Sequence, residues 1–354
     1  MKKNILLLCL FSLQFLTLAA TADEAARAAA ILPGTTVLLI NQDVSGKGPM
    51  ADKLKSISQS DSMLSKLTQK VPAGRSGKSS CMMNAFQNLS KEKKECKSLY
   101  MQVCSNYPQG NDFCVINELN TALTLQEIKK EIAEQASKAG KEATFKDGTA
   151  AGIPFIEVAI EEVSDAIALV EGGKTILAAR PANVLQDILK RYQARQSVAL
   201  TDRMSALRAS AKAPATSIAQ VLVDITPEMQ KKLVDKANDA ENPMMGAAME
   251  PCSKLTGFAM SLSLEDNALP LNLLFQAGNA TDATAFKTQF LDGMVLPMLP
   301  SLAPMMGITT PLNFVNSLKA AQEGNVATLT TAFTISDIDT IATLAKKFAA
   351  ASQE

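Results

Sequence analysis

The sequence contains no histidine and no tryptophan, and it has only three tyrosines. Without histidine, the chain cannot carry out Ser-His-Asp or Cys-His catalysis, and it cannot build a zinc or iron site that needs a histidine ligand. Carboxylate-based glycoside hydrolysis and Ser-Lys nucleophilic attack remain open as the chemistry of a hydrolase, but neither leaves a motif in this sequence. We therefore expect a protein that is not an enzyme, with no catalytic residues, no cofactor and no metal.

Net charge is absent as well, because 35 basic residues balance 35 acidic ones. A chain without a large basic field has no electrostatic means of holding nucleic acid or an anionic lipid surface. The length of 354 residues and the hydrophobic content of 47% suit one large domain or two ordinary ones. We expect no nucleic-acid partner, and two other partners stay open: a protein of the cell envelope or an apolar ligand.

The N-terminus has the three parts of an export signal. Lys2 and Lys3 precede an apolar run from Ile5 to Ala20, and the small residues of Ala20-Thr21-Ala22 fit the cleavage rule. The run is shorter than the roughly 20 residues of a membrane span. We predict a signal peptide over residues 1–22, cleavage near Ala22, and a periplasmic or secreted protein; a retained N-terminal anchor is the alternative.

Four cysteines cluster in a short part of the chain, at Cys81, Cys96, Cys104 and Cys114. In an oxidising compartment such a cluster predicts two disulfides. We favour Cys104–Cys114 with Cys81–Cys96, because the turn at residues 106–111 would bring Cys104 opposite Cys114; the other pairings stay open. A metal site is disfavoured, since the spacings include no close C-x-x-C pair. Cys252 is expected to be a buried free thiol, with an intermolecular disulfide as the alternative.

The fold class follows from the hydrophobic pattern. Strand-like segments alternate apolar and polar residues, which favours antiparallel sheets with one covered face. A hairpin is predicted around Gly172-Gly173, a helix is predicted to start at the capping box Thr124–Glu127, and strands are predicted near residues 217–225 and 257–275. Residues 81–104 have a helical pattern. We predict an α+β fold in two loosely repeated halves, residues 23–211 and 212–354, with a cysteine-rich helical insert at 79–116.

This order of elements resembles a family of exported bacterial proteins of unknown function, the DUF3352-like group. The resembling stretches are Leu32 to Leu38, Asp165 to Tyr192, and Leu200 to Asp224, about two thirds of the chain when the elements between them are included. The cysteine segment departs from the pattern. The resemblance implies no enzyme activity and no catalytic residues.

Four further segments could carry a function. Residues 74–79 resemble the end of a phosphate-binding loop, but Pro72 stands where that motif needs glycine, so we expect a solvated linker. The Met- and Pro-rich stretch from Met294 to Leu312 is expected to be a core-covering loop, or else an adaptable surface for lipids or partner helices. Two acidic clusters could hold calcium or perform acid–base work, although exposed acids are ordinary in turns: Glu161, Glu162 and Asp165, and Glu265 with Asp266.

We therefore expect an exported, non-catalytic binding or interaction protein. The alternative is a periplasmic carrier of a lipid or another apolar ligand, for which an apolar cavity of some hundreds of Å³ would be the sign.

Overall fold

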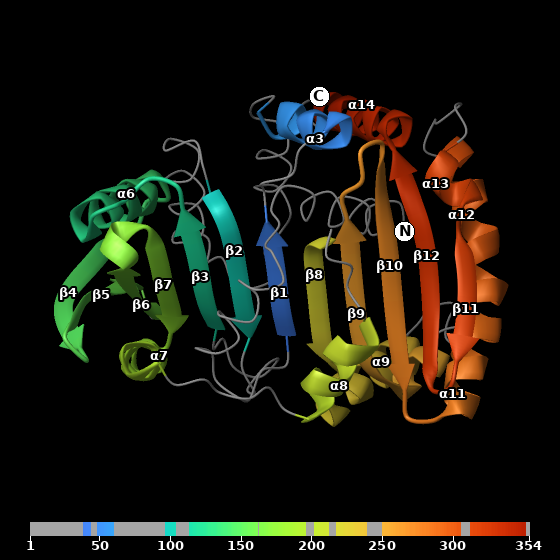
Figure 1. Ribbon diagram of the computed structural model, residues 1–354, viewed down its shortest axis with the longest axis horizontal. Coiled ribbons are helices and arrows are strands. Elements are labelled where there is room, and N and C mark those ends of the chain that lie inside the picture. Colours follow the sequence, from blue (N-terminus) through green and yellow to red (C-terminus); the bar gives the residue numbers. More distant parts are fainter. Residues whose placement is uncertain are drawn as a thin grey trace. The chain divides into compact units, whose positions relative to one another are not determined.

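The computed structural model describes residues 38–43, 48–59, 96–103, 113–161, 163–195, 202–211, 217–238, 250–305 and 312–351. They fall into two compact units, each an antiparallel sheet with helices packed on it, which confirms the α+β class (Figure 1). Unit 1 contains α3 (Pro49–Gln59) and the described chain from Asp202 onward, and unit 2 contains the remaining described strands and helices between Leu38 and Ala194.

The division falls before α8 (Asp202–Ala211), whereas the sequence pattern placed this helix in the N-terminal half, which was to end at residue 211. The helix belongs to unit 1 because its buried side chains, Met204 and Leu207, pack it against β8 and β9. Helix α3 joins the same unit from much earlier in the chain.

Unit 2 has its described strands in the order β1-β2-β3-β7-β6-β5-β4. Helix α6 follows β3, and α7 follows β7 (Figure 1). The elements are β1 (Leu38–Asp43), β2 (Cys96–Val103), β3 (Phe113–Leu119), α6 (Leu125–Lys138), β4 (Ala143–Ala150), β5 (Ile153–Ile160), β6 (Val163–Val170), β7 (Thr175–Arg180) and α7 (Ala182–Ala194).

Local signals in the sequence fix several of these elements. Thr124 Oγ1 accepts a hydrogen bond from Glu127 N over 3.2 Å, and Glu127 Oε2 accepts one from Thr124 N over 2.8 Å, which confirms the predicted capping box of α6. The predicted Gly-Gly turn is also confirmed, since Gly172 and Gly173 both adopt a positive φ between β6 and β7. Glycine reaches this backbone region without the steric cost that other residues meet.

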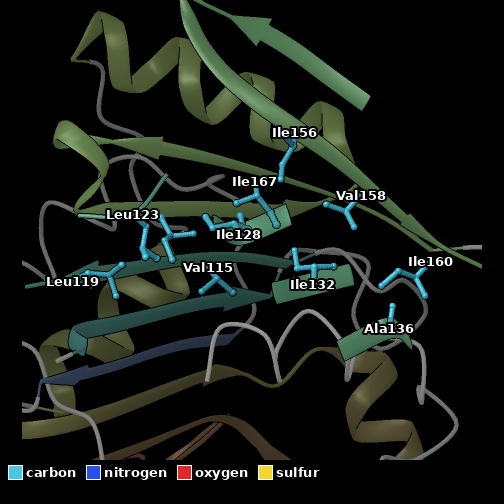
Figure 2. Close-up of a cluster of buried hydrophobic side chains, with 12 residues drawn as sticks. Val115, Leu119, Leu123, Ile128, Ile132, Ala136, Ile156, Val158, Ile160 and Ile167 are labelled. Carbon is cyan, nitrogen blue, oxygen red and sulfur yellow. The ribbon is translucent and has the colours of Figure 1, made fainter. Parts of the chain in front are cut away.

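The core of unit 2 lies between α6 and the sheet, and Figure 2 shows its side chains. Ile128 and Ile132 of α6 are fully buried against strand residues such as Ile156. Complete burial of one such side chain contributes about 1.5–3 kcal/mol relative to an exposed one. The members of this cluster are Val115, Leu119, Leu123, Ile128, Ile132, Ala136, Ile156, Val158, Ile160, Ile167, Ile176 and Ala178.

The expectation of one covered face is wrong for the middle of this sheet. Every residue of β7, from Thr175 to Arg180, is buried. Ile176 and Ala178 belong to the cluster under α6, and the intervening residues project to the opposite face because strand side chains alternate. Helix α7 packs against β6 and β7, so we infer that it covers that second face.

The predicted cysteine-rich helical insert is also wrong where the structure describes it. Residues 96–103 form β2 and residues 113–119 form β3, paired in antiparallel register with Val103 opposite Phe113. In β2, apolar Leu99, Met101 and Val103 recur at every second position, which is a strand period that the helical reading overlooked. Hydrogen-bonding neighbours on both sides, β1 and β3, then favour the extended form.

Unit 1 has its described strands in the order β11-β12-β10-β9-β8. Hairpins followed by helices recur, as the sequence pattern predicted. Besides α3 and α8, its elements are β8 (Ser217–Asp224), α9 (Pro227–Asn238), β9 (Leu255–Ser263), β10 (Ala268–Ala277), α11 (Ala280–Ala285), the π-helical segment η4 (Phe286–Val295), α12 (Leu296–Met305), α13 (Asn313–Asn316), β11 (Lys319–Glu323), β12 (Val326–Thr334) and α14 (Ile335–Ala351).

Helices gather at both ends of the unit 1 sheet (Figure 1). At one end α3 and α14 meet the sheet, where Met50 and Ile338 pack with Leu269. At the other end lie α8, α9 and α11, beside the residues where β8 and β10 finish and β9 and β12 begin. This second end is the one that holds a pocket.

Candidate functional site

A pocket of about 440 Å³ lies at the end of the unit 1 sheet beside α8 and α9. The ends of β8, β9 and β10 and the residue before β12 line one side, and the first two turns of α8 and the first turn of α9 line the other. The lining residues are Asp202, Arg203, Ala206, Leu207, Asp224, Pro227, Gln230, Thr256, Gly257, Gln276, Ala277, Gly278 and Asn325. Seven of these thirteen residues have polar or charged side chains, whereas the buried clusters are apolar.

The glycine at position 257 lets α8 approach the sheet closely. A Cβ atom built there would lie 3.1 Å from Leu207 Cδ1 and 3.3 Å from Gln276 Oε1. Contacts this short would force one neighbour away, so glycine permits the packing that forms this wall of the pocket.

Arg203 ties α8 to the strand ends through one nitrogen of its guanidinium group. Arg203 Nη2 donates to the backbone oxygens of Ile225 and Thr256, over 3.1 and 3.0 Å. The same atom lies 2.8 Å from Asp224 Oδ1. Nη2 carries two protons, and both are used on the backbone oxygens. Arg203 and Asp224 therefore attract each other as opposite charges, but Nη2 donates no hydrogen bond to Asp224.

Asp224 therefore has a buried oxygen atom that receives no hydrogen bond from the described residues. Its side chain is 12% exposed, and Oδ1 is the buried atom that lacks a donor. Burial raises the pKa of Asp224, and the charge of Arg203 opposes that rise. A buried acceptor without a donor costs about 1–3 kcal/mol, and the charge of Arg203 beside Oδ1 offsets part of that cost.

The amide side chains of the lining point their nitrogen atoms at the sheet. Gln230 Nε2 donates to the Leu255 oxygen over 2.7 Å, and Asn325 Nδ2 donates to the Ala277 oxygen over 3.1 Å. Thr256 Oγ1 likewise donates to the Gln276 oxygen over 3.3 Å. The Gln230 and Asn325 amides each use one of their two N–H protons on a strand end, and their oxygens accept no hydrogen bond from the described residues.

The first predicted acidic cluster has a structural role in the described residues. Asp165 forms a two-armed ion pair with Arg180, with both side chains nearly buried. Glu161 lies 3.2 Å from Lys141 Nζ on the surface, and Glu162 lies outside the described residues. Because these acids have partners or solvent, the structure does not gather them into a site.

The second acidic cluster lies far from the pocket along the strands. Glu265 and Asp266 occupy the turn between β9 and β10, where the Asp266 backbone oxygen accepts a hydrogen bond from Met50 N. Both β9 and β10 run from this turn to the opposite end of the sheet. The turn therefore helps to hold α3 in place. Among the described residues, no group of three or more acids, cysteines or histidines could hold a metal ion.

The cysteine predictions are tested only in part. Cys252 is buried, as expected, and it has no disulfide partner in the part of the chain that the structure describes; burial raises the pKa of its thiol to about 12. Cys114 lies in β3, Cys96 begins β2, and Cys81 and Cys104 lie outside the described residues. The pairing Cys104–Cys114 with Cys81–Cys96 therefore stays a prediction, as does the linker at residues 74–79.

The Met- and Pro-rich stretch is helical rather than a loop up to Met305. Helix α12 contains Pro297, Pro300 and Pro304, and it contains no charged residue. Leu296 and Val295 pack partly against the buried cluster around Phe286. None of the helices that the structure describes is long and apolar enough to cross a membrane.

Sequence reasoning missed the pocket because its residues have no motif. Arg203, Asp224 and Gln230 are far apart in the chain and converge only through pairing of β8 with β9. The one available signal was that the predicted strand ends carry glycine, at Gly257 and Gly278.

No protein-family model and no curated protein sequence matches this chain. Among solved structures, the chain is similar to TP0453 in crystal forms III, I and IV, with 11% sequence identity in each case and TM-scores of 0.42, 0.39 and 0.43. The matches cover 88%, 89% and 90% of this chain and 96%, 96% and 95% of the other.

Proposed function

We propose that this chain is an exported protein that binds a small polar ligand in the unit 1 pocket and performs no catalysis on it. The observation that carries the proposal is a pocket of about 440 Å³ whose lining includes the charged side chains of Arg203 and Asp224 and the amide side chains of Gln230 and Asn325. A concave site with a few placed polar groups is the usual form of a ligand site.

The lining offers little support for catalysis. Its hydroxyl group, on Thr256, donates to a backbone oxygen, and its half-buried carboxyl group, on Asp224, is held beside Arg203. A nucleophile needs a general base within hydrogen-bond reach, and neither group supplies that arrangement for the other among the contacts described.

The apolar-carrier alternative receives less support from the same pocket. Charged and amide side chains are part of the lining, including Arg203, Asp224 and Asn325. An apolar ligand would leave these groups without water and without hydrogen bonds, which costs free energy for each one.

Export is proposed on the pattern of residues 1–22 alone. Expression of the full chain in a bacterial host, followed by mass spectrometry of the periplasmic and secreted fractions, tests this part. We expect a mature N-terminus near Asp23, and an intact Met1 on protein confined to the cytosol would contradict export.

Binding is tested by blocking the pocket. The variant Ala206→Trp adds a bulky side chain to an exposed lining residue of α8, and Ala209→Trp makes the same change at an exposed alanine later in that helix, outside the lining. A panel of small polar metabolites is screened by thermal shift and calorimetry. We expect a ligand that binds the wild type and Ala209→Trp but not Ala206→Trp; equal binding to all three, or no binder in the panel, would count against the proposal.

A further inference from the structure

We propose that two copies of this chain associate through β11, the outermost strand of the unit 1 sheet, as a symmetric antiparallel dimer with Ala321 at its two-fold axis. The strand has a free backbone edge, and its charges complement those of a second copy. The dimer needs no ligand in the unit 1 pocket, so it can be tested separately from ligand binding.

The outer edge of β11 has backbone groups without partners. The strand comes first in the order of unit 1 and pairs only with β12 among the described strands (Figure 1). Their hairpin has a two-residue loop that closes on Glu323 and Val326, and such a loop follows a hydrogen-bonded pair. Because hydrogen-bonded pairs alternate along an antiparallel ladder, the N–H and C=O groups of Ala320 and Gln322 point away from β12. No other backbone group of the described residues bonds to them.

The side chains along this edge are self-complementary in charge. When a strand pairs with its own copy around a two-fold axis normal to the sheet, one residue lies opposite itself and its neighbours face each other symmetrically. With Ala321 at the axis, Lys319 of each copy lies opposite Glu323 of the other copy. All three residues are exposed and share one face of the sheet. Opposite charges placed directly across an antiparallel pair stabilise it.

The axis at Ala321 is the one that pairs both charges. An axis at Ala320 would place Lys319 opposite Ala321, and an axis at Gln322 would place Glu323 opposite Ala321. Each of these shifts leaves charged groups without a partner of opposite sign. Among the described residues, neither Lys319 nor Glu323 forms an ion pair within its own chain, so both are available to a second copy.

The edge strand of unit 2 has the opposite property. Strand β4 comes last in the order of that unit, and its two middle residues are Lys146 and Asp147. An axis at either residue would place a charge opposite an identical charge, which opposes pairing. Charges of this kind are a common protection of edge strands against association. The charges of β11 exclude an apolar strand in the same way, but they accept a copy of β11.

Apolar surface next to β11 adds to the contact. Ala320 and Leu296 both pack against the buried cluster around Phe286, on the face of the sheet opposite the two charges. Leu296 begins α12, which contains no charged residue. A two-fold axis normal to the sheet places α12 of both copies on the same face of the joined sheet. Because a five-residue strand is a small contact, we expect a dimer of modest affinity.

Charge reversal tests the pairing of Lys319 with Glu323. Lys319→Glu gives each copy two negative edge charges, Glu323→Lys gives each copy two positive ones, and the double variant restores opposite pairs with the signs exchanged. Sedimentation equilibrium of the mature protein measures association, and we expect a wild-type dissociation constant between ~1 μM and ~1 mM. Each single variant should associate at least about tenfold more weakly. An equimolar mixture of the two single variants, and the double variant alone, should associate as the wild type does.

A control variant reverses a charge elsewhere in unit 1. Lys231 is exposed on α9, outside the proposed contact, so Lys231→Glu should leave association unchanged. Circular dichroism and the melting temperature show whether each variant is folded. The mixture keeps the test available, because it uses the same two single variants that fail to associate alone.

Cross-linking tests the position of the axis. Residues opposite each other in a non-hydrogen-bonded antiparallel pair have Cα atoms about 4.5 Å apart, which is within the range of a disulfide. Ala321→Cys should therefore form an intermolecular disulfide on mild oxidation. Lys319→Cys, an exposed cysteine in the same strand with Glu323 opposite it, should cross-link at least about tenfold more slowly.

Four results would overturn the proposal. They are a wild type that stays monomeric throughout the concentration range, association that neither charge reversal weakens, a mixture of the single variants that does not associate, and equal cross-linking of the two cysteine variants. A dimer that neither reversal weakens would use another surface of the chain.

Discussion

Arg180 donates two hydrogen bonds to Asp165 inside unit 2, from Nε to Oδ1 over 2.5 Å and from Nη2 to Oδ2 over 2.8 Å. The two side chains are 10% and 8% exposed. The pair joins neighbouring strands β6 and β7 at the end of the hairpin that the Gly-Gly turn opens.

Substitution of one partner should destabilise the protein. Asp165→Asn removes the carboxylate that pairs with the buried Arg180 charge, and we expect a loss of about 3–5 kcal/mol in the free energy of unfolding. Urea denaturation measures it. Asp187→Asn is the control, because its partner Lys190 is exposed and such surface pairs contribute about 0–1 kcal/mol. Equal effects of the two substitutions would show that the buried pair has no special role.

Substitution of the two glycines in the Gly-Gly turn should have unequal effects on stability. At Gly173, with φ of +89°, a Cβ would lie 2.3 Å from the Leu123 backbone oxygen, whereas at Gly172, with φ of +67°, nothing lies within 4 Å. We expect Gly172→Ala to cost about 1 kcal/mol from backbone strain. Gly173→Ala should cost clearly more, since the backbone of Leu123 must also move. Thermal or urea denaturation of both variants checks the order, and a reversed order would contradict the turn geometry.

Cys252 should make stability fall at alkaline pH. Its folded pKa is raised to about 12 from an ordinary value of 9.0, so its contribution is fully present below pH 9 and is lost as pH rises toward 12. We compare the free energy of unfolding of the wild type and Cys252→Ala at pH 8, 9, 10 and 10.5. The advantage of the wild type should shrink above pH 9, by at most about 1.4 kcal/mol per pH unit. A constant difference would mean that the thiol is accessible to water.

The disulfide pairing is directly measurable in the mature protein. We expect two disulfides, Cys104–Cys114 and Cys81–Cys96, and a free Cys252. Non-reducing proteolysis with mass spectrometry identifies the linked peptides, and alkylation before reduction identifies the free thiol. Four alkylated cysteines in residues 81–114 of exported protein would contradict the prediction.

Much of the fold was accessible from the sequence because its signals are local. The Thr124–Glu127 capping box, the Gly172-Gly173 turn and the alternation in β8 each act within a few residues. The strand β2 was not predicted, because residues 81–104 were assigned a helical pattern as a whole. The alternation of Leu99, Met101 and Val103, which is typical of a strand, was overlooked. Its extended form depends on pairing with β1 and β3, which no local window contains.

The candidate site was out of reach for a related reason. In the sequence, Asp224 is an acid at the end of a strand and Arg203 is a base in a helix, and nothing connects them. The pairing of β8 with β9 places Asp224 opposite Gly257. What makes the site unusual is the missing donor on Asp224 Oδ1, which arises because the Arg203 protons go to Ile225 and Thr256. This feature depends on side-chain geometry, which the sequence alone does not predict.

The most direct test of ligand binding in unit 1 is an NMR titration of the ¹⁵N-labelled mature protein with a binder from the metabolite panel. We predict that the largest shift changes occur at the side-chain amides of Gln230 and Asn325 and at the backbone amides of Gly257 and Gly278, which line the pocket. Changes confined to unit 2 or to residues 294–312, with these four positions unmoved, would contradict the account.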